Sequence, residues 1–159
     1  MNALATALAT LGGIGRLPFA PGSWGSLLAI LLVPALLGWI GDAGFAIATL
    51  LVTLVGIWAG GRHERESGRH DAPEVVIDEL AGQWATLLPL LHLDPVPPAI
   101  LDYVAAFLLF RLFDIWKPWP IRRLDASVPG GFGTMLDDLA AAVPAGAILL
   151  ALHLFVFLR

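Results

Sequence analysis

The stretch FRLFDIWKPWPIRRLDASVPGGFGTMLDDLAAA, residues 110–142, organises the rest of this sequence. It lies between two long apolar segments and combines four aspartates, four basic residues and a glycine triplet. These residues are Asp114, Asp125, Asp137 and Asp138, then Arg111, Lys117, Arg122 and Arg123, then Gly130, Gly131 and Gly133. Charges gathered at the edge of apolar segments are costly unless they serve a site, so we expect one here.

The first half of this stretch predicts a polar stripe at the end of a helix. Arg111, Asp114 and Lys117 are spaced three residues apart, which places them on one helical face. Pro118 and Pro120 then end the helix, because proline cannot continue the backbone hydrogen-bond ladder.

The second half predicts the start of another helix. Gly130 and Gly131 allow backbone conformations that other residues resist, and Thr134 suits an N-cap. The helix would then carry Asp137 and Asp138 in its first turn. Free N–H groups at such a start can hold an anion or orient carboxylates.

Composition indicates a membrane protein of one domain, residues 1–159. Hydrophobic residues make up 58% and charged residues 14% of the 159, far from the averages of soluble domains. The net charge of −4 gives no case for binding nucleic acid. The sequence has no cysteine, so disulfides, thiolate metal sites and cysteine nucleophiles are excluded.

The apolar segments predict an all-α fold, a polytopic helical bundle with about four to five membrane-embedded helices plus short interfacial ones. The segments are residues 27–40, 45–59, 80–93, 99–113 and 139–158, with a tight turn at 39–44. Whether 80–93 crosses fully is left open, because it is short and contains proline. If the segments alternate, the arginine-rich loops share one side, which the positive-inside rule makes cytoplasmic.

Two further polar segments are expected on that side. In APGSWGS, residues 20–26, the small residues Gly22, Ser23 and Ser26 suit a phosphate cradle, although a loop that only caps the next helix is as good an explanation. In HDAPEVVIDELAGQW, residues 70–84, we predict a helix that starts near Ala72. Asp78 and Glu79 would follow about two turns later, beside apolar residues, as candidate metal ligands.

The chemistry of these groups indicates magnesium and phosphate. Carboxylates without sulfur ligands suit Mg²⁺, and arginine and lysine suit a phosphate. The alternative is that the charges form surface ion pairs and a capping box. The apolar surroundings favour the site over this alternative.

Together, APGSWGS, HDAPEVVIDELAGQW and FRLFDIWKPWPIRRLDASVPGGFGTMLDDLAA resemble the phosphatidylglycerophosphatase A family of bacterial lipid phosphatases. The resemblance implies a Mg²⁺-dependent enzyme of the bacterial inner membrane that converts phosphatidylglycerophosphate to phosphatidylglycerol and has its site on the cytoplasmic side. Family motif positions correspond to Asp78, Glu79, Asp114, Lys117, Pro118, Gly130, Gly131, Gly133, Asp137 and Asp138. Ser23 stands where threonine is common, and Thr134 where isoleucine is.

The predicted site divides into three sets. The metal ligands would be Asp78, Glu79, Asp114, Asp137 and Asp138; the catalytic set Asp78, Glu79, Asp114, Asp138 and Lys117; the phosphate-binding set Arg111, Lys117, Arg122, Arg123, Gly22, Ser23, Ser26, Gly130 and Gly131. The reaction would be Mg²⁺-assisted attack by water, with attack by a carboxylate as the alternative. Two rival classes are an ion-coupled transporter, whose acids would spread through the membrane depth, and a catalytically silent lipid-binding subunit.

Overall fold

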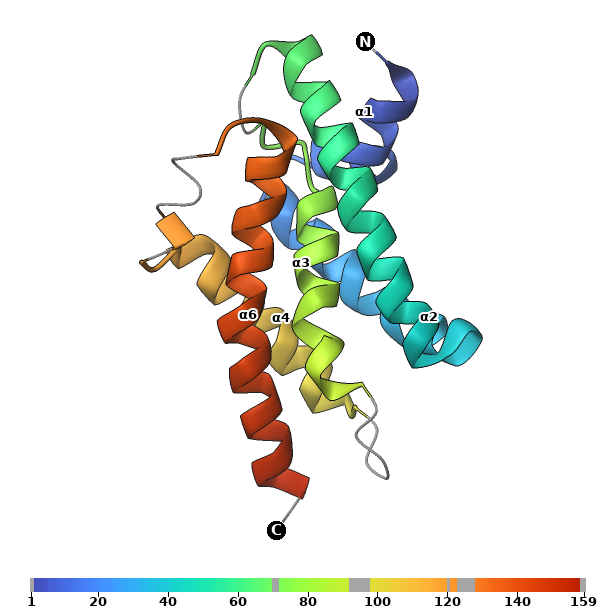
Figure 1. Cartoon of the computed structure of the whole chain (residues 1–159), viewed down its shortest axis with the longest axis vertical. Helices are drawn as coiled ribbons and strands as arrows, with labels where there is room; N and C mark the ends of the chain where they lie inside the picture. The colour runs from blue at the N-terminus through green and yellow to red at the C-terminus, as the bar shows by residue number, and fades with distance from the viewer. Residues whose placement is uncertain (1, 70–71, 92–97, 120, 123–127, 158–159) are drawn as a thin grey trace.

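The computed structural model describes residues 2–69, 72–91, 98–119, 121–122 and 128–157, and the regular elements in these ranges are all helices (Figure 1). The elements are α1 (Ala3–Ala9), η1 (Leu11–Arg16), α2 (Pro21–Ser67), α3 (Ile77–Leu87), η2 (Leu88–Leu90), α4 (Ile100–Trp116) and α6 (Gly130–Phe157). The described residues contain no β-strand. The all-α class predicted from the sequence is therefore confirmed.

Helix α2 reverses direction at Gly41, where the backbone leaves the helical region with φ 65° and ψ −178°. Figure 1 shows the two legs, residues 21–40 and 42–67, forming a hairpin. Glycine adopts a positive φ without the steric cost that a side chain adds. The tight turn predicted at 39–44 is therefore confirmed.

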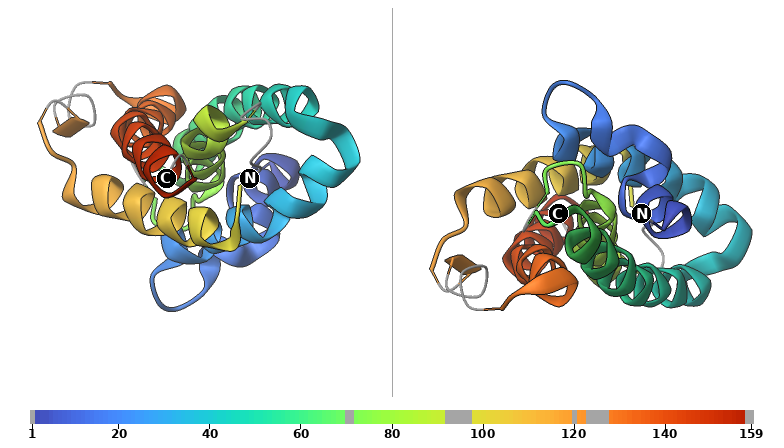
Figure 2. Two further views of the ribbon diagram at one scale, coloured as in Figure 1. Left: turned by 90° about the horizontal axis from the view of Figure 1, so that it is seen from below. Right: turned by 90° about the horizontal axis from the view of Figure 1, so that it is seen from above.

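Helix α3 lies at the centre of the bundle, enclosed by α2, α4 and α6 (Figure 2). Trp84 anchors it to the first leg of α2 by donating an indole N–H bond of 3.0 Å to the carbonyl of Ala29. Its ring also packs on Phe45 with centroids 5.3 Å apart. Because α3 has 11 residues, it extends only about 16 Å and cannot cross a bilayer alone.

The predicted start of this helix near Ala72 is wrong. Ala72–Val75 forms a turn instead, in which the amide of Val75 donates to the carbonyl of Ala72. The next amide, of Val76, donates to the carbonyl of Ala9 on α1, and this tertiary bond keeps the segment out of the helix. Asp78 and Glu79 therefore stand in the first turn of α3.

Two of the described helices, α2 and α6, are long and apolar enough to cross a membrane. Most residues in their most apolar windows are not buried, unlike those of a core helix in a soluble protein. Length and composition thus mark two helices as candidate spans, fewer than the predicted four to five. Fewer spans are found because the two legs of α2 are counted together as one helix. In addition, α3 with 11 residues and α4 with 17 are shorter than the roughly 20 residues that a span needs.

The start of α6 is fixed by a glycine contact with α2. A Cβ on Gly131 would lie 2.2 Å from the amide nitrogen of Gly61 and 2.4 Å from the carbonyl oxygen of Ile57, so only glycine fits. The helix begins at Gly130, and Thr134 is not its N-cap as predicted. The Thr134 hydroxyl instead approaches the carbonyl of Gly130, at 3.5 Å, one turn back.

Candidate active site

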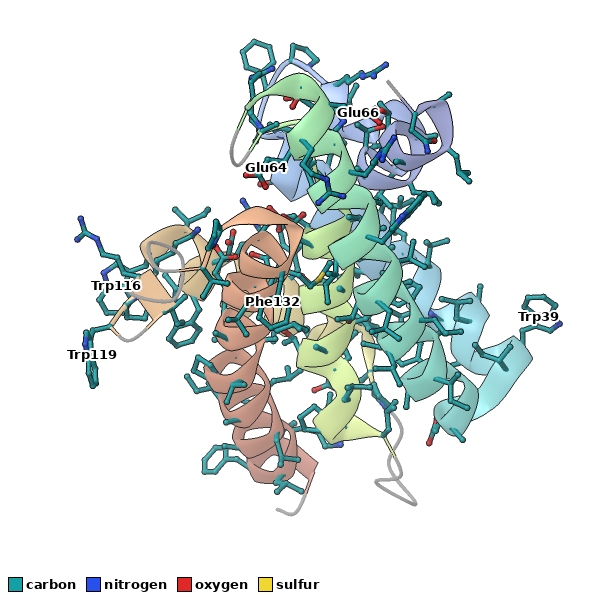
Figure 3. All side chains as sticks on the ribbon, turned by 45° about the horizontal axis from the view of Figure 1, so that its top comes forward. Trp39, Glu64, Glu66, Trp116, Trp119 and Phe132 are labelled. Atoms are coloured by element: carbon teal, nitrogen blue, oxygen red, sulfur yellow. The ribbon has the colours of Figure 1, made fainter. Side chains whose placement is uncertain are left out.

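The ends of α3, α4 and α6 and the start of α2 surround a polar cavity of about 280 Å³. Figure 3 shows carboxylate oxygens gathered near the start of α6, at the same end of the bundle. The cavity is lined by Ala20, Pro21, Gly22, Ala72, Pro73, Val75, Asp78, Glu79, Arg111, Asp114, Lys117, Thr134, Asp137 and Asp138. All five acids predicted as metal ligands, and the two bases Arg111 and Lys117, therefore converge here from three segments of the sequence.

Three of the acids converge tightly enough to hold one metal ion. Glu79, Asp114 and Asp138 each offer a carboxylate oxygen, and the three oxygens lie within 4.8 Å of one another. Oδ2 of Asp138 is buried without a hydrogen-bond partner among the described residues. An unsatisfied buried carboxylate oxygen is costly unless a cation compensates it, and oxygen ligands of this kind suit Mg²⁺.

The balance of charge in the cavity also favours a cation. Five carboxylates face two bases, Arg111 and Lys117. Nη1 of Arg111 pairs with Oε2 of Glu79 and lies 2.6 Å from Oδ2 of Asp114. Burial raises the pKa of Glu79, and the neighbouring Asp114 raises it further, against the opposing effect of Arg111. A divalent ion would relieve this excess of negative charge.

Lys117 is the C-cap residue of α4, and its side chain reaches the cavity. Its backbone is left-handed, with φ 42°, and its amide donates to the carbonyl of Phe113. This conformation is uncommon for a residue with a side chain, and here the following Pro118 prevents the helix from continuing. The Lys117 ammonium consequently pairs with Oδ2 of Asp137 across the cavity.

The start of α2 approaches Glu79 closely. A Cβ on Gly22 would lie 1.9 Å from Oε1 of Glu79 and 3.1 Å from Nη1 of Arg111. Ser26, fully buried one turn further on, donates a 2.8 Å hydrogen bond to Oε2 of Glu79. Neither Ser23 nor Ser26 caps the helix, because α2 begins at Pro21. Its N-cap residue is Ala20, which has a left-handed backbone and makes no side-chain hydrogen bond to the helix.

Known proteins are similar to this chain over most of its length. The family model for phosphatidylglycerophosphatase A matches residues 7–153. The chain belongs to the phosphatidylglycerophosphatase A family. The phosphatidylglycerophosphatase A of Escherichia coli K12 is 37% identical over 140 residues, 86% of this chain and 76% of that protein. No solved structure matches the chain.

Two further relatives are similar to this chain, and one of them has a different name. The phosphatidylglycerophosphatase A of Haemophilus influenzae is 37% identical over 142 residues, covering 89% of this chain and 83% of that protein. A protein of Bacteroides thetaiotaomicron named putative phosphatidylinositol-3-phosphatase is 38% identical over 135 residues, covering 82% of each.

Several of the predicted phosphate-binding residues of this phosphatidylglycerophosphatase A family member do not line the cavity. Ser26 lies behind Glu79, and Gly131 packs against α2. Ser23, Arg122 and Gly130 are likewise absent from the lining. Arg123, together with Asp71 and Asp125, lies outside the described residues. Of the nine predicted phosphate-binding residues, the cavity contains Gly22, Arg111 and Lys117.

The turn Ala72–Val75 covers one side of the cavity, and the sequence does not predict that these residues line the site. Glu74 tethers this turn, since its Oε1 lies 3.1 Å from Nη1 of Arg69 and 3.5 Å from Nε2 of the buried His63. His63 had no assigned role. Its function as a tether depends on the approach of α2 to the turn, which no local pattern indicates.

Proposed function

We propose that this protein is a membrane lipid phosphatase that hydrolyses the terminal phosphate of phosphatidylglycerophosphate, giving phosphatidylglycerol and phosphate. The observation that carries the proposal is the convergence of Glu79, Asp114 and Asp138 within 4.8 Å, beside Arg111 and Lys117. Acids that hold a cation next to bases that hold an anion suit a phosphate monoester. Membership of the phosphatidylglycerophosphatase A family supports the choice of lipid.

Magnesium fits the acids of this cavity. Asp78, Glu79, Asp114, Asp137 and Asp138 would hold it, with the buried Oδ2 of Asp138 as the atom that most needs a cation. When bound, Mg²⁺ supplies a Lewis acid that withdraws charge from the phosphate oxygens.

The protein's own groups account for the rest of the reaction. Arg111 and Lys117 bind the phosphate oxygens and stabilise charge as it accumulates there. A water oxygen attacks phosphorus, the bond from phosphorus to the glycerol oxygen breaks, and the glycerol oxygen takes up the proton that the attacking water releases. Asp78 or Asp138 orients the water and accepts its proton, because both carboxylates line the cavity.

The proposal includes a multi-pass arrangement in the bacterial inner membrane, with the site on the cytoplasmic side, where the positive-inside rule puts the arginine-rich loops. The two legs of α2, together with α4 and α6, supply four apolar segments, and α3 fills the space between them. Trp39 lies at the reversal of α2, whereas Trp116 and Trp119 project from the opposite side of the bundle (Figure 3). All three are exposed, as interfacial tryptophans are.

A different phosphorylated lipid is the second candidate substrate. The relative from Bacteroides thetaiotaomicron carries a name for a phosphatase of a phosphoinositide. The three cavity carboxylates would serve a phosphate monoester on either headgroup, so the headgroup itself must be tested.

The test is phosphate release by purified protein in detergent micelles. Phosphatidylglycerophosphate, phosphatidate and phosphatidylinositol 3-phosphate are compared with and without Mg²⁺. We expect Mg²⁺-dependent release, fastest with phosphatidylglycerophosphate, and loss of release in Asp114→Asn while the variant still elutes as a folded monodisperse species. Equal activity of Asp114→Asn and the unaltered protein would refute the proposed site, and faster release from another lipid would refute the substrate.

A further inference from the structure

A second cavity, of about 370 Å³, adjoins the acidic one. The two share Pro21 and Pro73, which therefore form the ridge between them. The second cavity lies beside the loop that connects η1 to α2, and Arg16 and Glu74 are its charged lining residues. It contains none of the acids assigned to the metal.

The cavity presents a positive charge that the fold itself does not use. Arg16 is exposed at the end of η1 and forms no ion pair with a carboxylate of the described residues. The Glu74 carboxylate, in contrast, is matched by Arg69 at 3.1 Å and faces His63 at 3.5 Å. The guanidinium of Arg16 is therefore available to an anion, and its planar donors suit phosphate oxygens.

Leu17 and Pro18 line this cavity beside Arg16, and further exposed apolar residues follow them in the sequence. Leu17 and Phe19 follow Arg16 and are 41% and 80% exposed, and Trp24 is 46% exposed on the first turns of α2. The loop of residues 17–20, drawn in blue, projects from the side of the bundle in Figure 2. Exposed apolar and aromatic side chains beside a basic residue suit the boundary between lipid tails and headgroups.

We propose that the second cavity binds the inner phosphodiester of the substrate and that Arg16 determines specificity for lipids that carry one. This inference rests on the proposed function. The terminal monoester occupies the acidic cavity, the linking glycerol crosses the ridge of Pro21 and Pro73, and the diester meets Arg16. The tails then leave past Leu17 and Phe19. A lipid with a phosphate monoester alone would lack the second contact.

The test compares two lipids in the same mixed micelles, phosphatidylglycerophosphate with a monoester and a diester, and phosphatidate with the monoester alone. Arg16→Gln should raise KM for phosphatidylglycerophosphate about 10-fold or more, with a smaller change in kcat, because a charge-assisted hydrogen bond to phosphate is lost. KM for phosphatidate should stay within twofold. Arg16→Lys should recover part of the affinity, since it keeps the charge but loses the planar donors.

The control variant is Arg65→Gln, which removes an exposed arginine of α2 that lines neither cavity. It should leave KM for both lipids unchanged. An equal rise of KM for both lipids in Arg16→Gln, or no rise for either, would overturn the inference.

A second measurement separates this inference from the proposed function. Binding of glycerophosphoglycerol, the soluble diester headgroup, is followed by ligand-observed NMR with the unaltered protein and Arg16→Gln. If no lipid is hydrolysed but Arg16 is needed for this binding, the proposed function fails and the diester site stands. Binding that does not depend on Arg16 removes the diester site, whatever the enzyme hydrolyses.

Discussion

Ser26 and Glu79, 53 residues apart, are joined by a fully buried hydrogen bond of 2.8 Å from hydroxyl to carboxylate. The same oxygen of Glu79 accepts from Arg111, so helices α2 and α4 both orient the acid that α3 supplies. Oε1, the second oxygen of Glu79, is the one that Gly22 approaches. The position of this carboxylate is thus defined from three sides.

Removing the Ser26 hydroxyl should impair the reaction more than the fold. Ser26→Ala leaves shape nearly unchanged but frees Glu79 to rotate, and loss of such an orienting contact typically costs about 10-fold to 100-fold in metal affinity or activity. The measurements are kcat and the Mg²⁺ concentration for half-maximal rate. Thr53→Val is the matched control, since among the described residues the Thr53 hydroxyl bonds only the carbonyl of Thr49, at 2.9 Å. Equal effects of the two substitutions would contradict the orienting role.

Adding one methyl group at Gly22 should displace Glu79. In Gly22→Ala the new Cβ would meet the end of a side chain rather than backbone, so the fold can adjust while Oε1 of Glu79 moves. We expect a loss of activity of about 10-fold or more with a small change in melting temperature. Gly38→Ala is the control, because no described atom apart from the backbone of its own helix lies within 4 Å of its added Cβ. Full activity of Gly22→Ala would show that the close approach of Gly22 to Glu79 is not needed for the reaction.

Replacing Asp138 should weaken the binding of a divalent ion directly. Asp138→Asn keeps the shape but removes the charge on the buried Oδ2, so we expect Mn²⁺ affinity, measured by electron paramagnetic resonance, to fall about 10-fold or more. Treatment with a chelator should remove activity from the unaltered protein, and Mg²⁺ should restore it. Unchanged Mn²⁺ affinity in Asp138→Asn would exclude Asp138 as a ligand.

A buried pair far from the cavity should affect stability alone. Oδ2 of Asp102 on α4 lies 3.0 Å from Nδ1 of His153 on α6 and 2.7 Å from the amide of Ala99. His153→Leu should lower the free energy of unfolding by about 1–3 kcal/mol, because Asp102 loses a buried partner. The kcat should stay within twofold, since Asp102 lies 12 residues, about 18 Å, before Asp114 along α4.

A double substitution distinguishes a direct contact from a general packing effect. If the pair interacts, Asp102→Asn with His153→Leu should destabilise the protein by less than the sum of the single substitutions. Simple additivity would indicate that the two side chains do not depend on each other.

Local signals in the sequence predicted the elements that local forces determine. The reversal of α2 follows from glycine at position 41, and the end of α4 follows from Pro118. The start of α3 was predicted wrongly because a bond from Val76 to Ala9 outweighs the local helix-start signal at Ala72. Contacts between distant segments decide such cases.

The same division applies to the site. The acids and bases of the cavity can be predicted from the sequence, because charged residues are costly beside apolar segments and each one therefore indicates a special role. Ser26 was expected to touch phosphate, whereas it contacts Glu79, since the packing of α2 on α3 determines where its hydroxyl lies. The turn at Ala72–Val75 and its tether His63 are invisible to local patterns for the same reason.

The backbone contact between Gly131 and Gly61 gives α6 a fixed rotational setting. Asp137 and Asp138 follow Gly131 by six and seven residues. One residue inserted between Gly131 and Asp137 would rotate both carboxylates by about 100° around the helix axis. An insertion beyond Pro144 would leave them in place. Sequence length in this enzyme is therefore constrained on the short interval between the glycine contact and the acids, and again between the acids and His153, whose pairing with Asp102 fixes the same helix further along.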